Sequence, residues 1–535
     1  MIPLMILLAC RVPSAPEASS GPGVASFTVE GPTSPGGAIR RLVVREGRLF
    51  ELAADAPQQG ELVRVDLVTP GFIDAHAHPG GLGDWLAELN LTGAGSLAEV
   101  ITRVAAVSLP PGEWLLGRGW DQNDWSDAPP GGFPHAKDLD AVTGDRPAAL
   151  RRVDGHALWL NSAALRAAKI TKESIDPPGG RILRDAEGAP TGVLLDNAMA
   201  LVPVPEPSAE ARARRLRGAL LLAAHEGLVG VHDMGVDDAL LAAYTQLDAA
   251  GELPIRVWVY LTPESAAAKR LYAEGPWRGD RLEVVGVKLV ADGALGSRGA
   301  HLSQAYSDDP KNLGLTLMSQ DELRAATVLA LPKGAQVAVH AIGDAAVSDT
   351  LAAFAQARDA LPGAAAVPLR LEHAQVVRPE DWARLKALNV VASMQPTHAT
   401  SDMPWAEARL GPDRVEWSYA WRAPLDLGVV LAFGSDFPVE NVSPSYGFWS
   451  ATTRMSLDGA PPGGWRPEHR LTADETITAF TSATYAALGR GEGGEIVEGA
   501  VADVTLWRAE PQEGGVWYEP VAVLIDGVML ARGGN

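Results

Sequence analysis

Two histidines separated by one residue follow an apolar segment in the first fifth of the chain. They are His76 and His78, within Pro70-Gly71-Phe72-Ile73-Asp74-Ala75-His76-Ala77-His78-Pro79. On a β-strand, residues two apart point to the same side, so both imidazoles can face one ligand. Imidazole pairs suit Zn²⁺ and related divalent cations. Two histidines on one strand are also often incidental, so the assignment depends on the rest of the chain.

Four further polar residues lie at or near the ends of apolar segments: Lys288, His340, His373 and Asp436. A buried strand that stops on a charged residue is costly unless the charge is compensated, and one shared metal site would compensate all of them. For any single residue, a satisfied histidine or a surface charge is the simpler explanation. For the whole set, a metal site explains the pattern better.

Eight apolar segments with strand character alternate with Ala- and Leu-rich helical segments. They are Leu67–Asp74, Leu228–Met234, Ile255–Leu261, Val284–Ala291, Ala335–His340, Leu369–His373, Val390–Met394 and Val429–Ser435. This alternation predicts parallel strands joined by helices. Eight such strands close into a (β/α)8 TIM barrel, whose strands carry the active site at their C-terminal ends. The six polar residues named above lie at those ends.

One connection is much longer than the others, because about 150 residues separate the first two strand segments. We expect an insertion after barrel strand 1, over about residues 80–205, in a metal-dependent barrel that spans residues 68–486. Residues 25–67 and 487–535 show short alternating segments with Gly-rich turns. We interpret these two segments as the halves of one small β-sandwich domain.

The chain carries 66 acidic and 45 basic residues, for a formal net charge of −21. This balance disfavours nucleic acid as a partner, because phosphate binding needs a basic surface. It also disfavours binding to anionic lipid by charge alone. A small-molecule substrate is the partner we expect, and the sequence does not indicate an oligomeric state.

The single cysteine, Cys10, excludes an intramolecular disulfide and a thiolate metal cluster. It ends an apolar run, and Leu7-Leu8-Ala9-Cys10 resembles a bacterial lipobox, in which the cysteine is acylated. Residues 12–23, rich in Pro, Ser, Ala and Gly, would then be a tether. We therefore expect residues 1–24 to be a lipoprotein signal peptide and tether that anchor the protein to a membrane of the cell envelope. A disordered N-terminus on a cytoplasmic protein is the alternative.

The order and wording of the motifs resemble the amidohydrolase superfamily. Besides the His76 segment, the similar segments are Lys288 with Asp292-Gly293-Ala294-Leu295-Gly296-Ser297-Arg298, Val339-His340-Ala341-Ile342-Gly343-Asp344, Glu372-His373-Ala374-Gln375 and Gly434-Ser435-Asp436-Phe437-Pro438-Val439. They look like the YtcJ-like branch, amidohydrolase family 3, which includes N-substituted formamide deformylase. The resemblance covers about residues 40–530 and is more specific for the fold and the metal site than for the substrate.

The resemblance implies a set of metal ligands. His76, His78 and Asp436 would bind the more buried metal, and His340 with His373 would bind a second. Lys288, carboxylated on its terminal nitrogen, would bridge the two, since a free ammonium beside two cations would be repelled whereas a carbamate is an anion. The expected cofactor is one or two divalent ions, with Zn²⁺ preferred. A single-metal site with an unmodified lysine is the alternative.

The resemblance also implies substrate contacts. His156, within residues 152–162, would lie at the substrate mouth and polarise the scissile carbonyl or position the leaving group. A packing or helix-capping role is equally open for this segment. Arg298 is the second expected substrate contact. Asp196 stands where the branch more often has glutamate, which puts a substrate contact there in question.

Three other histidines lie near predicted strand ends. His232 ends the second strand, and we expect it to support a metal ligand from behind. His301 and His398 are candidates for the mouth of the site only.

The predicted activity is hydrolysis of a C–N bond in an amide, formamide or cyclic amide by a metal-activated hydroxide. The second metal or His156 would stabilise the oxyanion, and Asp436 would carry the proton to the departing amine. Hydrolysis of an ester, lactone or phosphoester by the same metal site is one alternative. A non-catalytic ligand-binding barrel of the cell envelope is the other.

Overall fold

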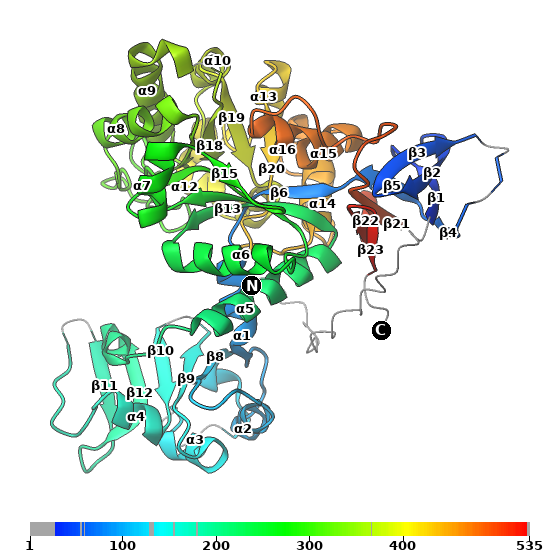
Figure 1. The fold of residues 1–535 in the computed structure, drawn as a ribbon. Coiled ribbons are helices and arrows are strands. Elements are labelled where there is room, and N and C mark those ends of the chain that lie inside the picture. The colour runs from blue at the N-terminus through cyan, green and yellow to red at the C-terminus, as the bar shows by residue number, and fades with distance from the viewer. Residues whose placement is uncertain are drawn as a thin grey trace. The chain divides into compact units, whose positions relative to one another are not determined.

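The computed structural model describes residues 27–53, 56–57, 59–127, 133–153, 156–177, 180–364 and 366–531. Cys10 and the predicted tether lie outside these residues, so the lipid anchor and the envelope location stay predictions. The chain forms two compact units, one of Met1–Leu82 with Leu216–Asn535 and one of Gly83–Arg215 (Figure 1). Among the described residues, no helix has the length and apolar character that a membrane crossing requires.

The larger unit contains eight parallel strands that run round a nearly closed barrel. Along the sheet they are β6 (Phe72–Ala77), β13 (Leu228–Val236), β14 (Arg256–Leu261), β16 (Leu282–Val290), β17 (Gln336–Ala341), β18 (Leu369–His373), β19 (Val390–Met394) and β20 (Leu431–Phe433). Strands such as β18 and β19 are buried along their whole length, as parallel strands covered on both faces are. The predicted TIM barrel is confirmed.

Helices connect and cover these strands (Figure 1). They are α6 (Asp238–Ala249), α7 (Ala266–Glu274), α8 (Gln320–Ala330), α9 (Asp344–Ala360), α10 (Pro379–Ala387), α11 (Pro396–Asp402), α12 (Ala406–Val415), α13 (Arg422–Asp426), α14 (Pro444–Thr453), α15 (Ala473–Phe480) and α16 (Ser482–Ala487). Two more helices, α1 (Pro79–Ala87) and α5 (Ala209–His225), each contain a boundary between the two units. Several helices begin at a side-chain cap, for example Ser319, which accepts a hydrogen bond from the backbone of Glu322 at the start of α8.

The barrel closes where β20 meets β6. The Asp74 carboxylate accepts hydrogen bonds from the hydroxyl of Ser435 at 2.6 Å and from the backbone nitrogen of His76 at 3.0 Å. The backbone nitrogen of Asp436 donates to the carbonyl of His76 at 2.7 Å. A Cβ atom at Gly434 would lie 2.5 Å from Asp74 Oδ1, so only glycine allows this approach. The closure therefore places Asp436 beside His76.

The expectation of one barrel strand over Leu67–Asp74 is wrong in its first half. Leu67–Pro70 is a separate strand, β5, that pairs antiparallel with β21 (Val504–Gln512), and the barrel strand starts at Phe72. Gly71 lies at the junction, where a Cβ atom would come within 2.3 Å of the Val229 side chain. The apolar run is continuous in sequence because both strands are buried, but it belongs to two sheets.

A small β-sandwich is built from both ends of the described chain. One sheet has the order β3-β2-β1-β4, and the other has the order β23-β22-β21-β5. Their remaining bounds are β1 (Phe27–Pro32), β2 (Ile39–Arg45), β3 (Arg48–Leu52), β4 (Glu61–Arg64), β22 (Gly515–Ile525) and β23 (Val528–Ala531). One apolar core joins Val44 and Leu49 of the first sheet with Leu506 and Leu524 of the second. The composite β domain that the sequence predicts is therefore present.

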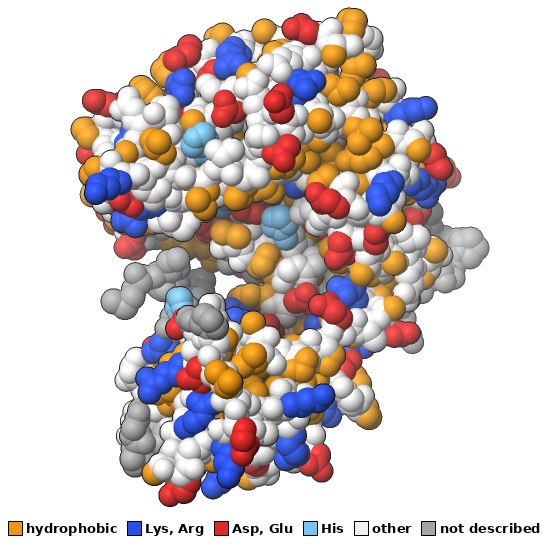
Figure 2. Space-filling view, turned by 90° about the vertical axis from the view of Figure 1, so that its left-hand side faces the viewer, with side chains coloured by type: hydrophobic (Ala, Val, Ile, Leu, Met, Phe, Trp, Pro, Cys, Tyr) orange, Lys and Arg blue, Asp and Glu red, His pale blue; other side chains and the backbone are white. Residues whose placement is uncertain are grey.

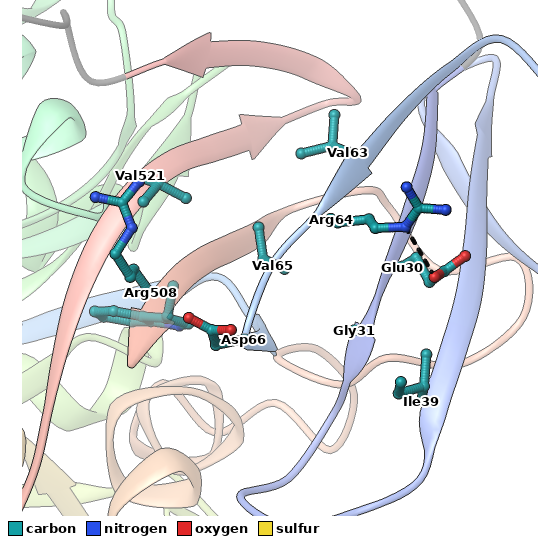
Figure 3. A pocket seen from close by; sticks show the side chains of 10 residues that line it. Glu30, Gly31, Ile39, Val63, Arg64, Val65, Asp66, Arg508 and Val521 are labelled. Carbon is teal, nitrogen blue, oxygen red and sulfur yellow. Dashed lines mark hydrogen bonds and ion pairs between the residues drawn. The ribbon is translucent and has the colours of Figure 1, made fainter. Parts of the chain in front are cut away.

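A groove of about 380 Å³ opens on this β domain (Figure 3). Residues from both chain ends line it, including Val63, Trp507 and Val521. Arg64 and Glu30 form an ion pair at 3.2 Å along one wall. None of the predicted metal ligands lines this groove, so it is separate from the predicted chemistry.

The second unit, Gly83–Arg215, follows the first barrel strand in the chain. Its six-stranded sheet has the order β11-β12-β10-β9-β8-β7. The elements are β7 (Leu89–Asn90), α2 (Leu97–Ala105), β8 (Leu115–Trp120), α3 (Ala136–Thr143), β9 (Ala148–Arg152), β10 (Ala157–Leu160), α4 (Ser162–Ala167), β11 (Gly180–Arg184) and β12 (Pro190–Asp196). Trp120, Trp125 and Trp159 pack together with ring centroids 5.9 to 6.2 Å apart. These tryptophans therefore belong to one of the two apolar clusters of the unit.

Candidate metal centre

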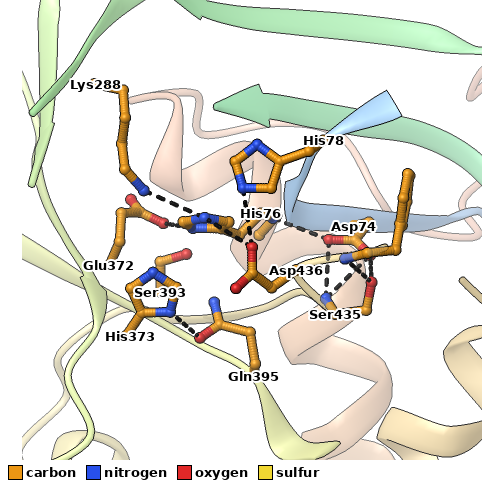
Figure 4. Close-up of polar contacts among 12 residues, drawn as sticks. Asp74, His76, His78, Lys288, Glu372, His373, Ser393, Gln395, Ser435 and Asp436 are labelled. Atoms are coloured by element: carbon orange, nitrogen blue, oxygen red, sulfur yellow. Dashed lines mark hydrogen bonds and ion pairs between the residues drawn. The ribbon is translucent and has the colours of Figure 1, made fainter. Parts of the chain in front are cut away.

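The C-terminal ends of five barrel strands bring the predicted metal ligands together (Figure 4). His76 lies on β6 with His78 just after it, Lys288 lies on β16, His340 lies on β17, His373 ends β18, and Asp436 follows β20. The parallel topology causes this convergence, because all the strands end on the same side of the barrel.

Asp436 lies between the two histidines of the first strand. Its Oδ1 atom is 3.0 Å from His78 Nε2 and 3.5 Å from His76 Nε2. The Lys288 amino nitrogen lies 3.2 Å from the same His76 Nε2 atom. Ligand atoms of His76, His373 and Asp436 lie within 4.8 Å of one another, and all three residues are buried. One cation could contact all three of these side chains.

His340 and His373 extend this cluster. Their ring centroids are 4.5 Å apart, and the ring of His373 is 4.6 Å from that of His76. The buried Nε2 atom of His340 has no hydrogen-bond partner among the described residues, and it lies 3.6 Å from an oxygen of Asp292. Buried polar atoms are normally paired, so an unpaired imidazole nitrogen beside other ligand-type groups fits a metal ligand.

Two supporting side chains fix the orientation of the imidazoles. His76 Nδ1 lies 2.6 Å from Glu372 Oε2, and His373 Nδ1 lies 2.9 Å from Gln395 Oε1. Both oxygens are acceptors, so each Nδ1 carries the proton and each Nε2 presents its lone pair. Figure 4 shows both contacts at the edge of the cluster. This is the arrangement that holds histidine ligands in metal sites.

Sequence reasoning did not identify Glu372, although a signal was present. In strand β18, Arg370 and Glu372 alternate with Leu369 and Leu371. Residues two apart in a strand share a face, so two charges on one face of a fully buried strand indicate a polar barrel interior.

Arg370 compensates the charge of Glu372 inside the barrel. Its guanidinium donates to Glu372 Oε1 at 2.7 Å, to the Ser393 hydroxyl at 3.0 Å and to the Tyr260 hydroxyl at 3.1 Å. It also donates to His232 Nδ1 at 2.7 Å. Arg370 and Glu372 therefore link His232 to the metal centre.

Burial sets the protonation of the ligand side chains. Loss of solvent lowers the pKa of His76 to about 4, that of His340 to about 3 and that of His373 well below its ordinary value. Burial also lowers the pKa of Lys288 to about 8. Burial opposes ionisation of Asp436, but the nearby His76 and the hydrogen bond from His78 hold its pKa below the ordinary range. Burial also acts to lower the pKa of His78, but its hydrogen bond to Asp436 and the nearby carboxylate charges together outweigh burial and raise this pKa instead. Three of the four imidazoles are thus neutral and Asp436 is an anion, the protonation states that bind metal.

Two site residues have left-handed backbone conformations. His373 has φ +71° and Asp436 has φ +65°. Such conformations cost about 1–3 kcal/mol each in residues other than glycine and concentrate at functional sites. The left-handed backbone at these residues interrupts the regular strand geometry, and both side chains lie in the cluster.

Asp292 has a clear structural role that the sequence did not reveal. Its carboxylate accepts backbone hydrogen bonds from His301 at 2.8 Å, Ile342 at 3.0 Å and Gly343 at 2.8 Å. Burial raises its pKa to about 7, although these three bonds favour the anion. Asp292 therefore fixes the loop that follows β17 and His340. Its position directly after a buried strand was the available signal.

The predicted substrate contacts lie in two places. His156 belongs to the second unit, where its Nδ1 lies 2.8 Å from Asp196 Oδ1 on an exposed face. Arg298 belongs to the barrel unit, and its guanidinium donates two hydrogen bonds of 3.0 Å to Asp308. Their roles in substrate binding stay predictions.

Comparison with known proteins gives a consistent result. The sequence model of the Amidohydrolase family matches residues 66–527. The protein YtcJ of Bacillus subtilis is 34% identical over 452 residues, which cover 83% of this chain and 84% of YtcJ. An N-substituted formamide deformylase of Arthrobacter pascens is 27% identical over 494 residues, covering 87% of this chain and 88% of the deformylase.

A solved structure is also similar to this chain. An uncharacterized metal-dependent hydrolase from Pyrococcus furiosus superposes with a TM-score of 0.71 at 28% identity. The alignment covers 89% of this chain and 97% of that structure. The likeness therefore includes nearly the whole of the archaeal protein.

Proposed function

Because this chain belongs to the amidohydrolase family and is a metal-dependent hydrolase, we propose that it cleaves a C–N bond in a small amide, formamide or cyclic amide. The observation that carries the proposal is the Asp436 carboxylate, which is buried among histidines and lies 3.0 Å from His78. The 27% identity to an N-substituted formamide deformylase supports the choice of a C–N bond.

The side chains present fit a divalent metal, and we propose Zn²⁺. Four imidazoles, from His76, His78, His340 and His373, together with the Asp436 carboxylate are ligand types that Zn²⁺ prefers. The unpaired buried Nε2 of His340 supports this choice, since a cation would give that atom a partner. A bound divalent ion would lower the pKa of a water and polarise the substrate carbonyl.

Asp436 is the group that moves the proton. Its Oδ1 atom contacts His78 and His76, whereas its Oδ2 atom faces His398 at 3.8 Å. We propose that this carboxylate accepts the proton of the attacking water and returns it to the leaving nitrogen. An anionic carboxylate at neutral pH suits this role, and its low pKa follows from the neighbouring histidines.

Lys288 is proposed to be carboxylated. Burial lowers the pKa of its amine, so the uncharged form is accessible near neutral pH. The uncharged amine would attack CO₂, form an N–C bond and release a proton. The product is a carbamate anion, which could bind metal. We expect protein made with added bicarbonate to hold close to two metals per chain by plasma mass spectrometry. Lys288→Ala should lose the pair, and retention of two metals in this variant would contradict the carbamate.

A substrate screen tests the proposed function. Metal-loaded protein is assayed against N-formyl amines, N-acyl amines and lactams, with esters, lactones and phosphoesters in parallel and Asp436→Asn as the matched control. We expect turnover of at least one amide class that disappears in the control. Turnover of esters or phosphoesters alone would instead support the alternative hydrolase. Tight binding without any turnover would support a ligand-binding barrel.

A further inference from the structure

The segment that follows β19 contains several buried hydrogen-bonding atoms without partners. Among the described residues, Gln395 Nε2, Thr397 Oγ1 and His398 Nε2 are buried and have no hydrogen-bond partner. The three side chains are 3%, 5% and 8% exposed. An unsatisfied buried donor costs about 1–3 kcal/mol, so three within four residues indicate a ligand that supplies acceptors.

The hydrogen bonds of His398 show which of its nitrogens donates. The Gln375 amide nitrogen lies 3.2 Å from His398 Nδ1. An amide NH₂ group can only donate, so Nδ1 is the acceptor and the neutral ring carries its proton on Nε2. The unpaired Nε2 atom is therefore a hydrogen-bond donor.

This donor faces the catalytic carboxylate and the metal ligands. His398 Nε2 lies 3.8 Å from Asp436 Oδ2, which is too far for a hydrogen bond. The His398 ring stacks on that of His373 with centroids 5.9 Å apart and an interplanar angle of 18°. Gln395 uses its oxygen to hold His373, and Figure 4 shows its amide nitrogen on the side of Asp436. Both free donors therefore border the metal centre.

We propose that His398 Nε2–H and the Gln395 amide N–H bind the carbonyl oxygen of the substrate, and that His398 is a catalytic residue that stabilises the negative charge on this oxygen. The inference rests on the proposed function, because it assigns the donors to a carbonyl under attack. Donors fixed in a buried site before the reaction stabilise an oxyanion without reorganisation.

The surroundings favour a neutral carbonyl over a carboxylate. The carboxylates of Asp436 and Asp402 both lie close enough to His398 to interact with it electrostatically. A second anion near these two would be repelled, whereas a carbonyl oxygen gains two hydrogen bonds. The substrate class is therefore a neutral acyl or formyl group and not a carboxylate-bearing group at this position.

Binding of cyclopentanone to the metal-loaded protein tests this subsite. This probe carries a neutral carbonyl and no bond that can be hydrolysed, so calorimetry measures its dissociation constant without turnover. If the substrate screen finds no substrate, the dissociation constant of the probe can still be interpreted. The variants are His398→Phe, which keeps the stacking ring, and His398→Gln, whose amide nitrogen reaches nearly the position of Nε2. His469→Phe is the matched control, because His469 lies in a separate 3-10 helix, Pro467–His469.

We expect His398→Phe to weaken probe binding about tenfold and His398→Gln to stay within about threefold of the parent, with unchanged metal content. On any amide that the parent hydrolyses, His398→Phe should lower kcat about 100-fold and raise KM by no more than about tenfold, the loss expected for the probe. A packing role would give the opposite order, with phenylalanine tolerated better than glutamine, and would overturn the proposal. Equal binding by all variants, or no binding by the parent, would also overturn it.

A second variant keeps the test decisive if His398→Phe does not fold. Gln395→Glu retains an oxygen that accepts from His373 but replaces the amide donor with an acceptor. We expect weaker probe binding with metal still bound. Parent-like probe binding by Gln395→Glu would overturn the proposal.

Discussion

The two units of the protein each contain a histidine–carboxylate pair of nearly equal geometry. His76 and Glu372 lie 2.6 Å apart, and His156 and Asp196 lie 2.8 Å apart. The side chains of the first pair are 1% and 0% exposed, whereas those of the second pair are 73% and 54% exposed. Removing one partner of a buried pair strands a charge in a low-dielectric interior, but an exposed pair contributes little. Distance alone therefore does not identify a functional contact.

The residues around the two pairs explain why we expect mutation of the buried pair to have the larger effect. Arg370 contacts Glu372 from behind, and His76 faces Lys288 and Asp436 on its other side. Through Glu372, the hydrogen bonds inside the barrel therefore fix the orientation of the His76 imidazole, a predicted metal ligand. The exposed pair lies in the second unit, where solvent screens its interaction, and a role of His156 in substrate binding stays a prediction.

Metal removal gives the largest expected effect. Dialysis against dipicolinate should lower turnover of the best amide substrate by at least about 100-fold, because no metal then remains to activate a water. Readdition of Zn²⁺ should restore turnover in the same sample. If metal-free protein turned over substrate at the parent rate, the buried pair would have no role in catalysis through a metal.

Replacement of Glu372 should have the next largest effect. Glu372→Gln removes the charge that orients His76, so the metal dissociation constant should rise about 10- to 100-fold. Competition with a chromogenic chelator measures this constant. Asp196→Asn, the same change in the exposed pair, should leave it within about twofold. Equal losses in the two variants would show that burial does not decide the role of such a pair.

The smallest effect is expected for the stability contribution of the exposed pair. Asp196→Asn should change the free energy of unfolding by less than about 1 kcal/mol, because solvent screens the interaction. Urea denaturation followed by circular dichroism measures the change. A loss above about 2 kcal/mol would mean that the pair supports the fold of the second unit.

Much of the barrel could be predicted because its sequence signals are local. Val390–Met394 and Leu369–His373 are strands with the bounds expected from their apolar runs. The predicted ligand set could be proposed from the sequence because each member lies at or near the end of such a run, and parallel topology alone brings strand ends together.

Other features depend on contacts that sequence spacing does not encode. The division of Leu67–Asp74 at Gly71 follows from close packing against Val229. The roles of Gln395 and His398 follow from which of their nitrogens remain unpaired, which only three-dimensional neighbours decide. The supporting role of Glu372 was accessible in principle from the alternation in β18, but its partner His76 lies almost 300 residues away, a separation of 296.

The central claim is that Asp436 moves the proton in a metal-dependent hydrolysis, and Asp436→Asn tests it most directly. The amide keeps an oxygen that can bind metal but removes the basicity of the carboxylate. Metal content and turnover of the best amide substrate are measured on the same preparation. We predict that metal content falls only modestly while kcat falls by at least about 100-fold, the usual scale for loss of a general base. Turnover close to that of the parent, with metal bound, would contradict the account.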